Sequence, residues 1–257
     1  MNTPIYFYSD VAREEMFNIV KDLPEAVEVY LVGGAVRNAL IQAFHQETWR
    51  QRDYDQIVTK GADEYFSYLE AKGFRDSSHD RPMQRIMAKA LSEDATEISY
   101  EENLVFDMHV VEGTTAADNL RNETGLLING VAISLRDIFR DDWEACLVTL
   151  PGALDSIKQR QVRINEYGYD KQPSNIFACL RFIGAGFSAP PQDEIRKLLL
   201  ELLKLDHEKY QKNLTKLSDY VGGDDHAREL GRRVIDQEVD LFNEETTKSW
   251  ISAQFVH

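Results

Sequence analysis

Cysteine, bulk positive charge and long apolar segments are all scarce in this sequence. Two cysteines among 257 residues, Cys146 and Cys179, exclude a disulfide framework and a cysteine-based metal cluster. The 44 acidic residues outnumber the 29 lysines and arginines, and the formal net charge of −15 excludes binding to nucleic acid through bulk charge alone. Any contact with nucleic acid must therefore be local, metal-assisted or supplied by a partner.

The apolar segments and the N-terminal residues indicate in which cellular compartment the protein is expected. No apolar run approaches the roughly 20 residues needed to span a bilayer, because charged residues interrupt even the leucine-rich stretch at 198–205. The first residues carry no basic and apolar export signal. We therefore expect a reduced, cytoplasmic protein without a membrane-spanning segment.

The chain nevertheless has enough apolar residues, 43%, to build a core. Its first 110 or so residues alternate short β-like runs with helical patterns, which favours an α/β or α+β domain. The last two β-like runs, residues 83–91 and 103–111, resemble the two strands of a hairpin with a long connection. The expected strands are residues 27–32, 53–59, 83–91 and 103–111, and the expected helices are residues 35–44 and 62–73.

The character of the chain changes after Pro151 and Gly152. Residues 125–135 are apolar enough for a buried strand or a tightly packed helix, and periodicity leaves both open. Beyond them the patterns suit helices. We expect two domains, residues 1–148 and 149–257. The expected helices are residues 154–164, 174–187, 193–205 and 226–242.

One group of residues in the first half has the composition of a phosphate and metal site. Gly33 and Gly34 lie at a strand-to-helix turn, where glycine allows close backbone approach and the helix N-terminus offers N–H donors to phosphate. Arg37, about one turn later, can supply a guanidinium group, which binds phosphate through two parallel hydrogen bonds. Asp53 and Asp55 project from the same face of the next strand and repel each other unless cations lie between them.

A third carboxylate, Asp107, belongs to the strand at 103–111. Alternation places it on the face opposite Leu104, Phe106 and Met108, together with His109. If this strand is a neighbour of the strand at 53–59, three carboxylates converge. Such a set suits two Mg²⁺ ions, which activate an attacking hydroxyl and stabilise leaving pyrophosphate.

With these residues in order, the sequence resembles the class II tRNA nucleotidyltransferase and poly(A) polymerase family of the polymerase β-like nucleotidyltransferase superfamily. The motif YLVGGAVRNAL, followed by RDYDQIVT, is similar to the family pattern LVGGAVRD with a downstream D-I-D. Weaker similarity continues through RNETGLLINGV and LPGALDSIKQRQVRI to QPSNIFACLRFIGAGF, so it covers about residues 27–188. The resemblance implies an α+β fold: a nucleotidyltransferase head with a small mixed β-sheet flanked by helices, followed by a helical neck-like domain.

The resemblance also implies roles for individual residues. Asp53, Asp55 and Asp107 would be the catalytic acids that hold two Mg²⁺ ions. The nucleotide, ATP or CTP, would contact Gly33, Gly34, Arg37, Asn129 and Arg181.

Two departures from the family pattern affect these expectations. The family's base-reading positions fall at Lys171, Gln172, Asn175 and Ala178, so that half of the site is altered. The sequence ends at His257, where family members continue, so we expect a short form without the body and tail domains.

The expected function is transfer of a nucleoside monophosphate from a nucleoside triphosphate to an acceptor hydroxyl, with an RNA 3′ end such as that of tRNA as the favoured acceptor. Two alternatives stay open: a protein acceptor, or a non-catalytic nucleotide-binding or interaction module with a degenerate base pocket. A protein partner or a second copy of the chain also stays open, whereas a membrane partner is not expected.

Overall fold

The computed structural model describes residues 3–50, 53–77, 84–91 and 102–168, and eight further positions: Cys179, Phe182, Gly186, Phe187, Ser188, Pro190, Pro191 and Glu194. Contacts divide the chain into two compact units, Met1–Leu120 with Asn129–Ala153, and Arg121–Ile128 with Leu154–His257. The expected division between residues 148 and 149 stays a prediction. Within the described ranges, no helix is long and apolar enough to cross a membrane.

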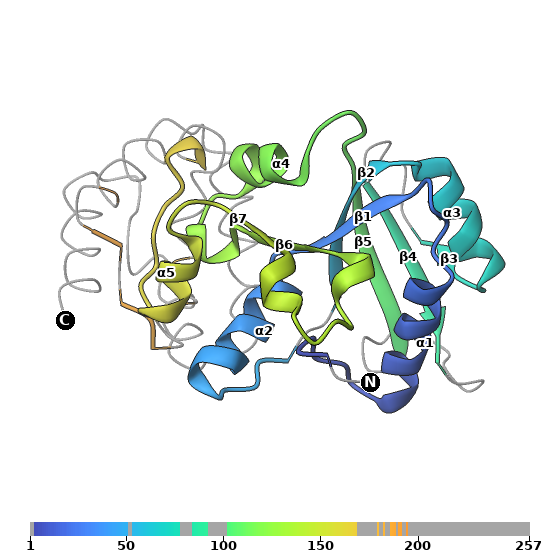
Figure 1. Cartoon of the computed structure of the whole chain (residues 1–257), viewed down its shortest axis with the longest axis horizontal. Coiled ribbons are helices and arrows are strands. Elements are labelled where there is room, and N and C mark those ends of the chain that lie inside the picture. The colour runs from blue at the N-terminus through green and yellow to red at the C-terminus, as the bar shows by residue number, and fades with distance from the viewer. Residues whose placement is uncertain are drawn as a thin grey trace, which may run out of the picture. The chain divides into compact units, whose positions relative to one another are not determined.

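The described part of the chain contains a mixed seven-stranded sheet in the order β3-β4-β5-β2-β1-β6-β7 (Figure 1). β2 and β5 run parallel, while every other neighbouring pair is antiparallel. Both the expected mixed sheet and the expected hairpin of β4 and β5 are confirmed. The strands are β1 (Glu28–Val32), β2 (Tyr54–Lys60), β3 (Arg75–Asp76), β4 (Gln84–Ala90), β5 (Asn103–Val110), β6 (Val131–Ser134) and β7 (Leu147–Thr149).

Helices flank this sheet, which confirms the α+β class. They are α1 (Asp10–Lys21), α2 (Gly34–His45) and α3 (Ala62–Ala71). The described ranges also contain α4 (Ala116–Glu123), whose last three residues belong to the second unit, and α5 (Ala153–Lys158), which belongs to it from Leu154 on. Sequence patterns did not predict α1, although Ser9 begins it as an N-cap whose Oγ accepts from the backbone N–H of Ala12. The C-terminal end of α1 contacts α3, where Tyr68 Oη donates to the carbonyl of Ile19 at 2.9 Å.

The central strands form because their side chains alternate between two environments. On β5, Leu104, Phe106 and Met108 are fully buried, whereas Asp107 is partly exposed and His109 is exposed. On β2, Tyr54 and Gln56 point to the face opposite Asp55. Gln56 is buried there and accepts from the hydroxyl of Tyr65 of α3 at 2.9 Å. One face of β2 and β5 is therefore packed, and the other carries the carboxylates.

Two sequence-based expectations need correction. Residues 125–135 form neither a single strand nor a single helix: a 3₁₀ turn at Leu127–Asn129 precedes β6, and a second one follows at Leu135–Asp137. The helix expected at 154–164 ends at Lys158, because Arg160 takes a left-handed conformation at φ 49°. Gln161 and Ile164 then make isolated β-bridges. The three helices expected further on lie almost wholly outside the described residues.

Candidate active site

The turn from β1 into α2 brings backbone against a carboxylate. Gly33 caps α2 with φ 59° and ψ −123°, a conformation that residues with a Cβ rarely adopt. A Cβ built there would lie 3.4 Å from Oδ2 of Asp55. The next residue, Gly34, starts a 12-residue helix with no acidic side chain in its first turn. The positive end of that helix therefore faces the carboxylate group and is available to an anion.

Two of the three predicted acids occupy facing positions on neighbouring strands. The parallel register of β2 and β5 pairs Asp55 with Asp107 directly. The neighbour relationship that the sequence left conditional is thus present. Asp53 lies just before β2, two residues from Asp55, and its charge acts on the Asp55 carboxyl. Three carboxylates therefore belong to one region of the sheet.

The electrostatics of Asp55 reflect this crowding. Burial, and to a smaller extent the negative charges of Asp53 and Asp107, together raise the pKa of its carboxyl to about 7. Arg37 and the backbone N–H of Gly34 act in the opposite direction but do not compensate. Near neutral pH the region consequently carries more negative charge than its own cations neutralise.

Hard carboxylate oxygens with excess negative charge fit Mg²⁺ in donor chemistry. Within the described ranges, however, no three His, Cys, Asp or Glu side chains are already grouped so that they could together hold a metal ion. Asp55 and Asp107 are the pair that the register brings together, and Asp53 is the nearest further donor. These are the residues on which a metal ion would depend.

Asp107 has a partner that sequence reasoning missed. Nε2 of Gln84, the first residue of β4, donates to Oδ1 and Oδ2 of Asp107 at 2.8 and 3.0 Å. Gln84 pairs with His109 across the two strands, and the alternation of β4 turns its side chain toward the carboxylate face. A lone glutamine in a strand carries no motif, so only the strand register reveals this contact.

Arg37 is held on three sides. It is only 5% exposed; its Nη1 donates to Oδ1 of Asn129 at 2.6 Å, and its Nε and Nη2 both donate to Oδ1 of Asn38 at 3.1 and 2.9 Å. Its guanidinium also lies 5.9 Å from the centre of the Trp49 ring. The structure therefore brings together Arg37 and Asn129, both predicted at the nucleotide, and adds Asn38.

Asn38 also joins this group to the loop after α2. Its Nδ2 donates to the carbonyl of Arg50 at 3.3 Å, while its Oδ1 serves Arg37. An aspartate, the residue at this point of the family pattern, could accept from Arg37 but could not donate to that carbonyl. The asparagine thus connects Arg37 with the loop that leads to Asp53.

The remaining predicted residues fall in different places. His109 is exposed on β5, on the face of Asp107. Arg181 lies outside the residues that the structure describes, as do the altered base-reading positions, Lys171, Gln172, Asn175 and Ala178. Their expected contacts with a nucleotide base stay predictions.

Comparison with known proteins places this geometry in a recognised fold. No protein-family model and no curated protein matches the sequence. Solved structures do match. The Thermotoga maritima CCA-adding enzyme complexed with tRNA has a TM-score of 0.61 and 18% identity, over 94% of this chain and 56% of that one.

Two further structures agree with the first. A CCA-adding enzyme with CTP has a TM-score of 0.62 and 18% identity, over 94% of this chain and 57% of that one. A tRNA-processing enzyme in an apo form has a TM-score of 0.61 and 19% identity, over 96% and 65%. The chain thus spans between half and two thirds of the length of these structures. Over that span, it has the α+β fold of the class II CCA-adding enzymes.

Proposed function

We propose that the chain is a metal-dependent nucleotidyltransferase that transfers a nucleoside monophosphate from a nucleoside triphosphate to an acceptor hydroxyl, with an RNA 3′ end as the favoured acceptor. The observation that carries the proposal is the facing pair Asp55 and Asp107 beside the Gly33 turn. The similar structures include complexes with tRNA, CTP and ATP, which supports the choice of substrates.

The Gly33 turn and the N-terminus of α2 indicate how the nucleoside triphosphate would bind. The triphosphate would lie at the N-terminus of α2, where backbone N–H groups and the helix dipole favour negative charge. Arg37 stays fixed by Asn38 and Asn129 and adds positive charge within reach of Asp55. A positioned cation loses little freedom when an anion binds, so this arrangement favours a defined phosphate geometry.

The transfer half depends on the carboxylates. Asp53, Asp55 and Asp107 would hold Mg²⁺, which when bound polarises the α-phosphate and stabilises developing negative charge. The acceptor oxygen bonds to the α-phosphorus while the bond from that phosphorus to the bridging oxygen breaks. Pyrophosphate leaves with the electron pair, and the hydroxyl proton passes to water. Gln84 keeps the Asp107 carboxylate oriented on β5.

Label transfer tests the proposal directly. The purified chain is incubated with Mg²⁺ and each nucleoside triphosphate labelled at the α-phosphate, with RNA ending in a tRNA-like 3′ strand. We expect label in the RNA, reduced at least about 100-fold in Asp53→Ala and Asp55→Asn. Asp141→Asn, a change at an exposed aspartate, is the matched control and should retain activity.

Other outcomes separate the alternatives. If the label is found on protein and not on RNA, the acceptor is a protein hydroxyl. Nucleotide binding without incorporation, with every acceptor and nucleotide tried, would overturn catalysis and leave a nucleotide-binding module.

A further inference from the structure

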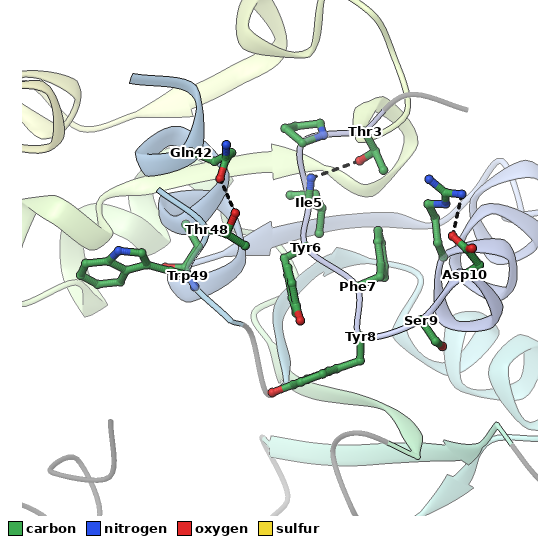
Figure 2. A pocket seen from close by; sticks show the side chains of 13 residues that line it. Thr3, Ile5, Tyr6, Phe7, Tyr8, Ser9, Asp10, Gln42, Thr48 and Trp49 are labelled. Atoms are coloured by element: carbon green, nitrogen blue, oxygen red, sulfur yellow. Dashed lines mark hydrogen bonds and ion pairs between the residues drawn. The ribbon is translucent and has the colours of Figure 1, made fainter. Parts of the chain in front are cut away.

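A pocket lies between the N-terminal segment and the side of α2. It has a volume of about 500 Å³ and is lined by residues 3–10, Arg13, two residues of α2 and two of the following loop (Figure 2). This volume falls in the range of sites for small organic ligands. No sequence motif pointed to it, because its walls come from separate parts of the chain.

The lining combines aromatic rings with hydrogen-bonding groups. Tyr6 and Tyr8 extend to the same side of the N-terminal segment (Figure 2), both partly exposed, with their rings edge to face at 5.4 Å between centroids. Trp49, also partly exposed, lines the loop side. Thr48 Oγ1 donates to Oε1 of Gln42 at 2.7 Å. Rings for stacking and amide or hydroxyl groups for base edges are what proteins use to hold an unpaired nucleobase.

The pocket adjoins the candidate active site through two shared contacts. Tyr54, between Asp53 and Asp55, donates its hydroxyl to the carbonyl of Tyr6 at 2.8 Å. Its ring also stacks on Phe7 at 5.4 Å between centroids. Asn38 lines the pocket and at the same time accepts from Arg37. A ligand in the pocket would therefore lie against the elements that position the carboxylates.

The pocket is nevertheless separate from the place of the reacting nucleotide. Tyr54 and Asp55 point to opposite faces of β2, so the N-terminal segment packs away from the carboxylates. Gln42 lies two turns along α2 from Gly34, about 12 Å at the helical rise. The pocket therefore lies along the side of α2, away from the helix end at which the triphosphate would bind.

We propose that this pocket binds the base of an unpaired nucleotide of the acceptor RNA, upstream of the reacting 3′ end. The inference rests on the proposed function. It also accounts for how a chain of net charge −15 can hold RNA: base stacking on aromatic rings does not depend on bulk positive charge, unlike contacts with phosphates.

Binding without turnover isolates this step. The dissociation constant of the whole chain for a 12-nucleotide single-stranded RNA is measured by fluorescence anisotropy at fixed salt, with neither Mg²⁺ nor nucleotide present. Tyr8→Ala should weaken binding about tenfold, whereas Tyr8→Phe, which keeps the ring, should stay within about threefold of wild type. Gln42→Ala, a change at an exposed side chain of the same pocket, should weaken it about threefold.

Two controls make the result specific. Tyr167→Ala removes another tyrosine, 48% exposed, that does not line the pocket, and should not change the affinity. An RNA with abasic sites upstream of its 3′ end should bind wild type and Tyr8→Ala equally, because it has no base to stack there. Matching thermal unfolding curves show that each variant is folded; if Tyr8→Ala fails this check, Gln42→Ala decides the question.

The outcomes separate this proposal from the proposed function. Unchanged RNA affinity in folded Tyr8→Ala, or an equal loss with abasic RNA, would overturn the subsite even if label transfer succeeds. If Tyr8→Ala weakens the binding of free ATP or CTP but not the binding of RNA, the pocket belongs to the incoming nucleotide. That result would overturn the assignment to the acceptor RNA. Failed label transfer together with base-dependent RNA binding would reject catalysis and keep the subsite.

Discussion

Nη1 of Arg37 donates to Oδ1 of Asn129 at 2.6 Å, across 92 residues of sequence. The contact joins the first turn of α2 to the 3₁₀ turn at Leu127–Asn129 that precedes β6. Because Arg37 is buried, its charge requires partners, and Asn38 and Asn129 provide them without cancelling that charge. Arg37 is therefore held in place and still positive, as an anion-binding cation should be.

Removal of the Asn129 amide should cost stability as well as function. In Asn129→Ala one donor of a buried guanidinium loses its acceptor, and we expect the free energy of unfolding to fall by about 1–3 kcal/mol. Urea unfolding monitored by circular dichroism measures the change. Asn122→Ala, at an exposed asparagine of α4, should change the free energy by less than about 0.5 kcal/mol. Equal effects of the two substitutions would contradict the role of the contact.

Gly33 and Gly113 form a natural pair for testing the close approach at Asp55. Both have positive φ, 59° and 81°, but a Cβ at Gly33 meets Asp55 Oδ2 at 3.4 Å, whereas a Cβ at Gly113 meets nothing within 4 Å. We expect Gly113→Ala to lower the free energy of unfolding by about 1 kcal/mol from backbone strain. Gly33→Ala should lower it by about 2 kcal/mol or more, mainly because its ψ of −123° is a further strain for a residue with a Cβ, which would only just contact Asp55. Thermal and urea unfolding of both variants provide the comparison. A smaller loss of stability in Gly33→Ala than in Gly113→Ala would contradict this expectation.

Ionisation of Asp55 should destabilise the metal-free fold. The pKa of its carboxyl is raised to about 7 by burial and then by the charges of Asp53 and Asp107. Because the folded value exceeds the unfolded one, the stability contributed by the neutral form is complete below about pH 4 and is lost as the pH rises to about 7. Asp55→Asn should therefore be more stable than wild type at pH 8, by roughly 2–4 kcal/mol, with little difference at pH 4.

Urea unfolding with EDTA at several pH values tests this expectation. Asp141→Asn serves as the control, because that aspartate is exposed. Millimolar Mg²⁺ should stabilise wild type at pH 8 and have less effect on Asp55→Asn. A wild-type protein that gains stability relative to Asp55→Asn as the pH rises from 4 to 8 would refute the expected sign.

Gln84 should act by orienting Asp107. Gln84→Ala removes the amide from both carboxylate oxygens and should lower the free energy of unfolding by about 1 kcal/mol. Gln84→Glu places a second carboxylate against Asp107 and should lower it by about 1–3 kcal/mol at pH 8, but less at pH 5. Denaturant titrations at both pH values measure the difference. Gln159→Glu, at an exposed glutamine, should show no such pH dependence, and the same behaviour at both positions would exclude the Gln84–Asp107 contact.

Sequence reasoning predicted the local elements best where a single pattern dominated. The strands around Asp55 and Asp107 begin and end within one residue of expectation, because alternation with apolar residues is a property of neighbouring positions. It failed at residues 154–164, where the helix ends early, at Lys158, and the left-handed Arg160 leads into isolated β-bridges. It does not predict α1 either, because an N-cap residue such as Ser9 does not by itself indicate a helix.

By itself, the sequence determined the class of the fold and the residue types of the candidate site, because a glycine pair at a strand-to-helix turn and carboxylates on alternating strands follow from local backbone geometry. Only the tertiary structure decided which of these residues meet. The pairing of Asp55 with Asp107 depends on a parallel register, and the contacts of Arg37 with Asn129 and of Gln84 with Asp107 depend on packing between distant segments. The aromatic pocket depends on it most, since a cavity exists only once separate parts of the chain enclose it.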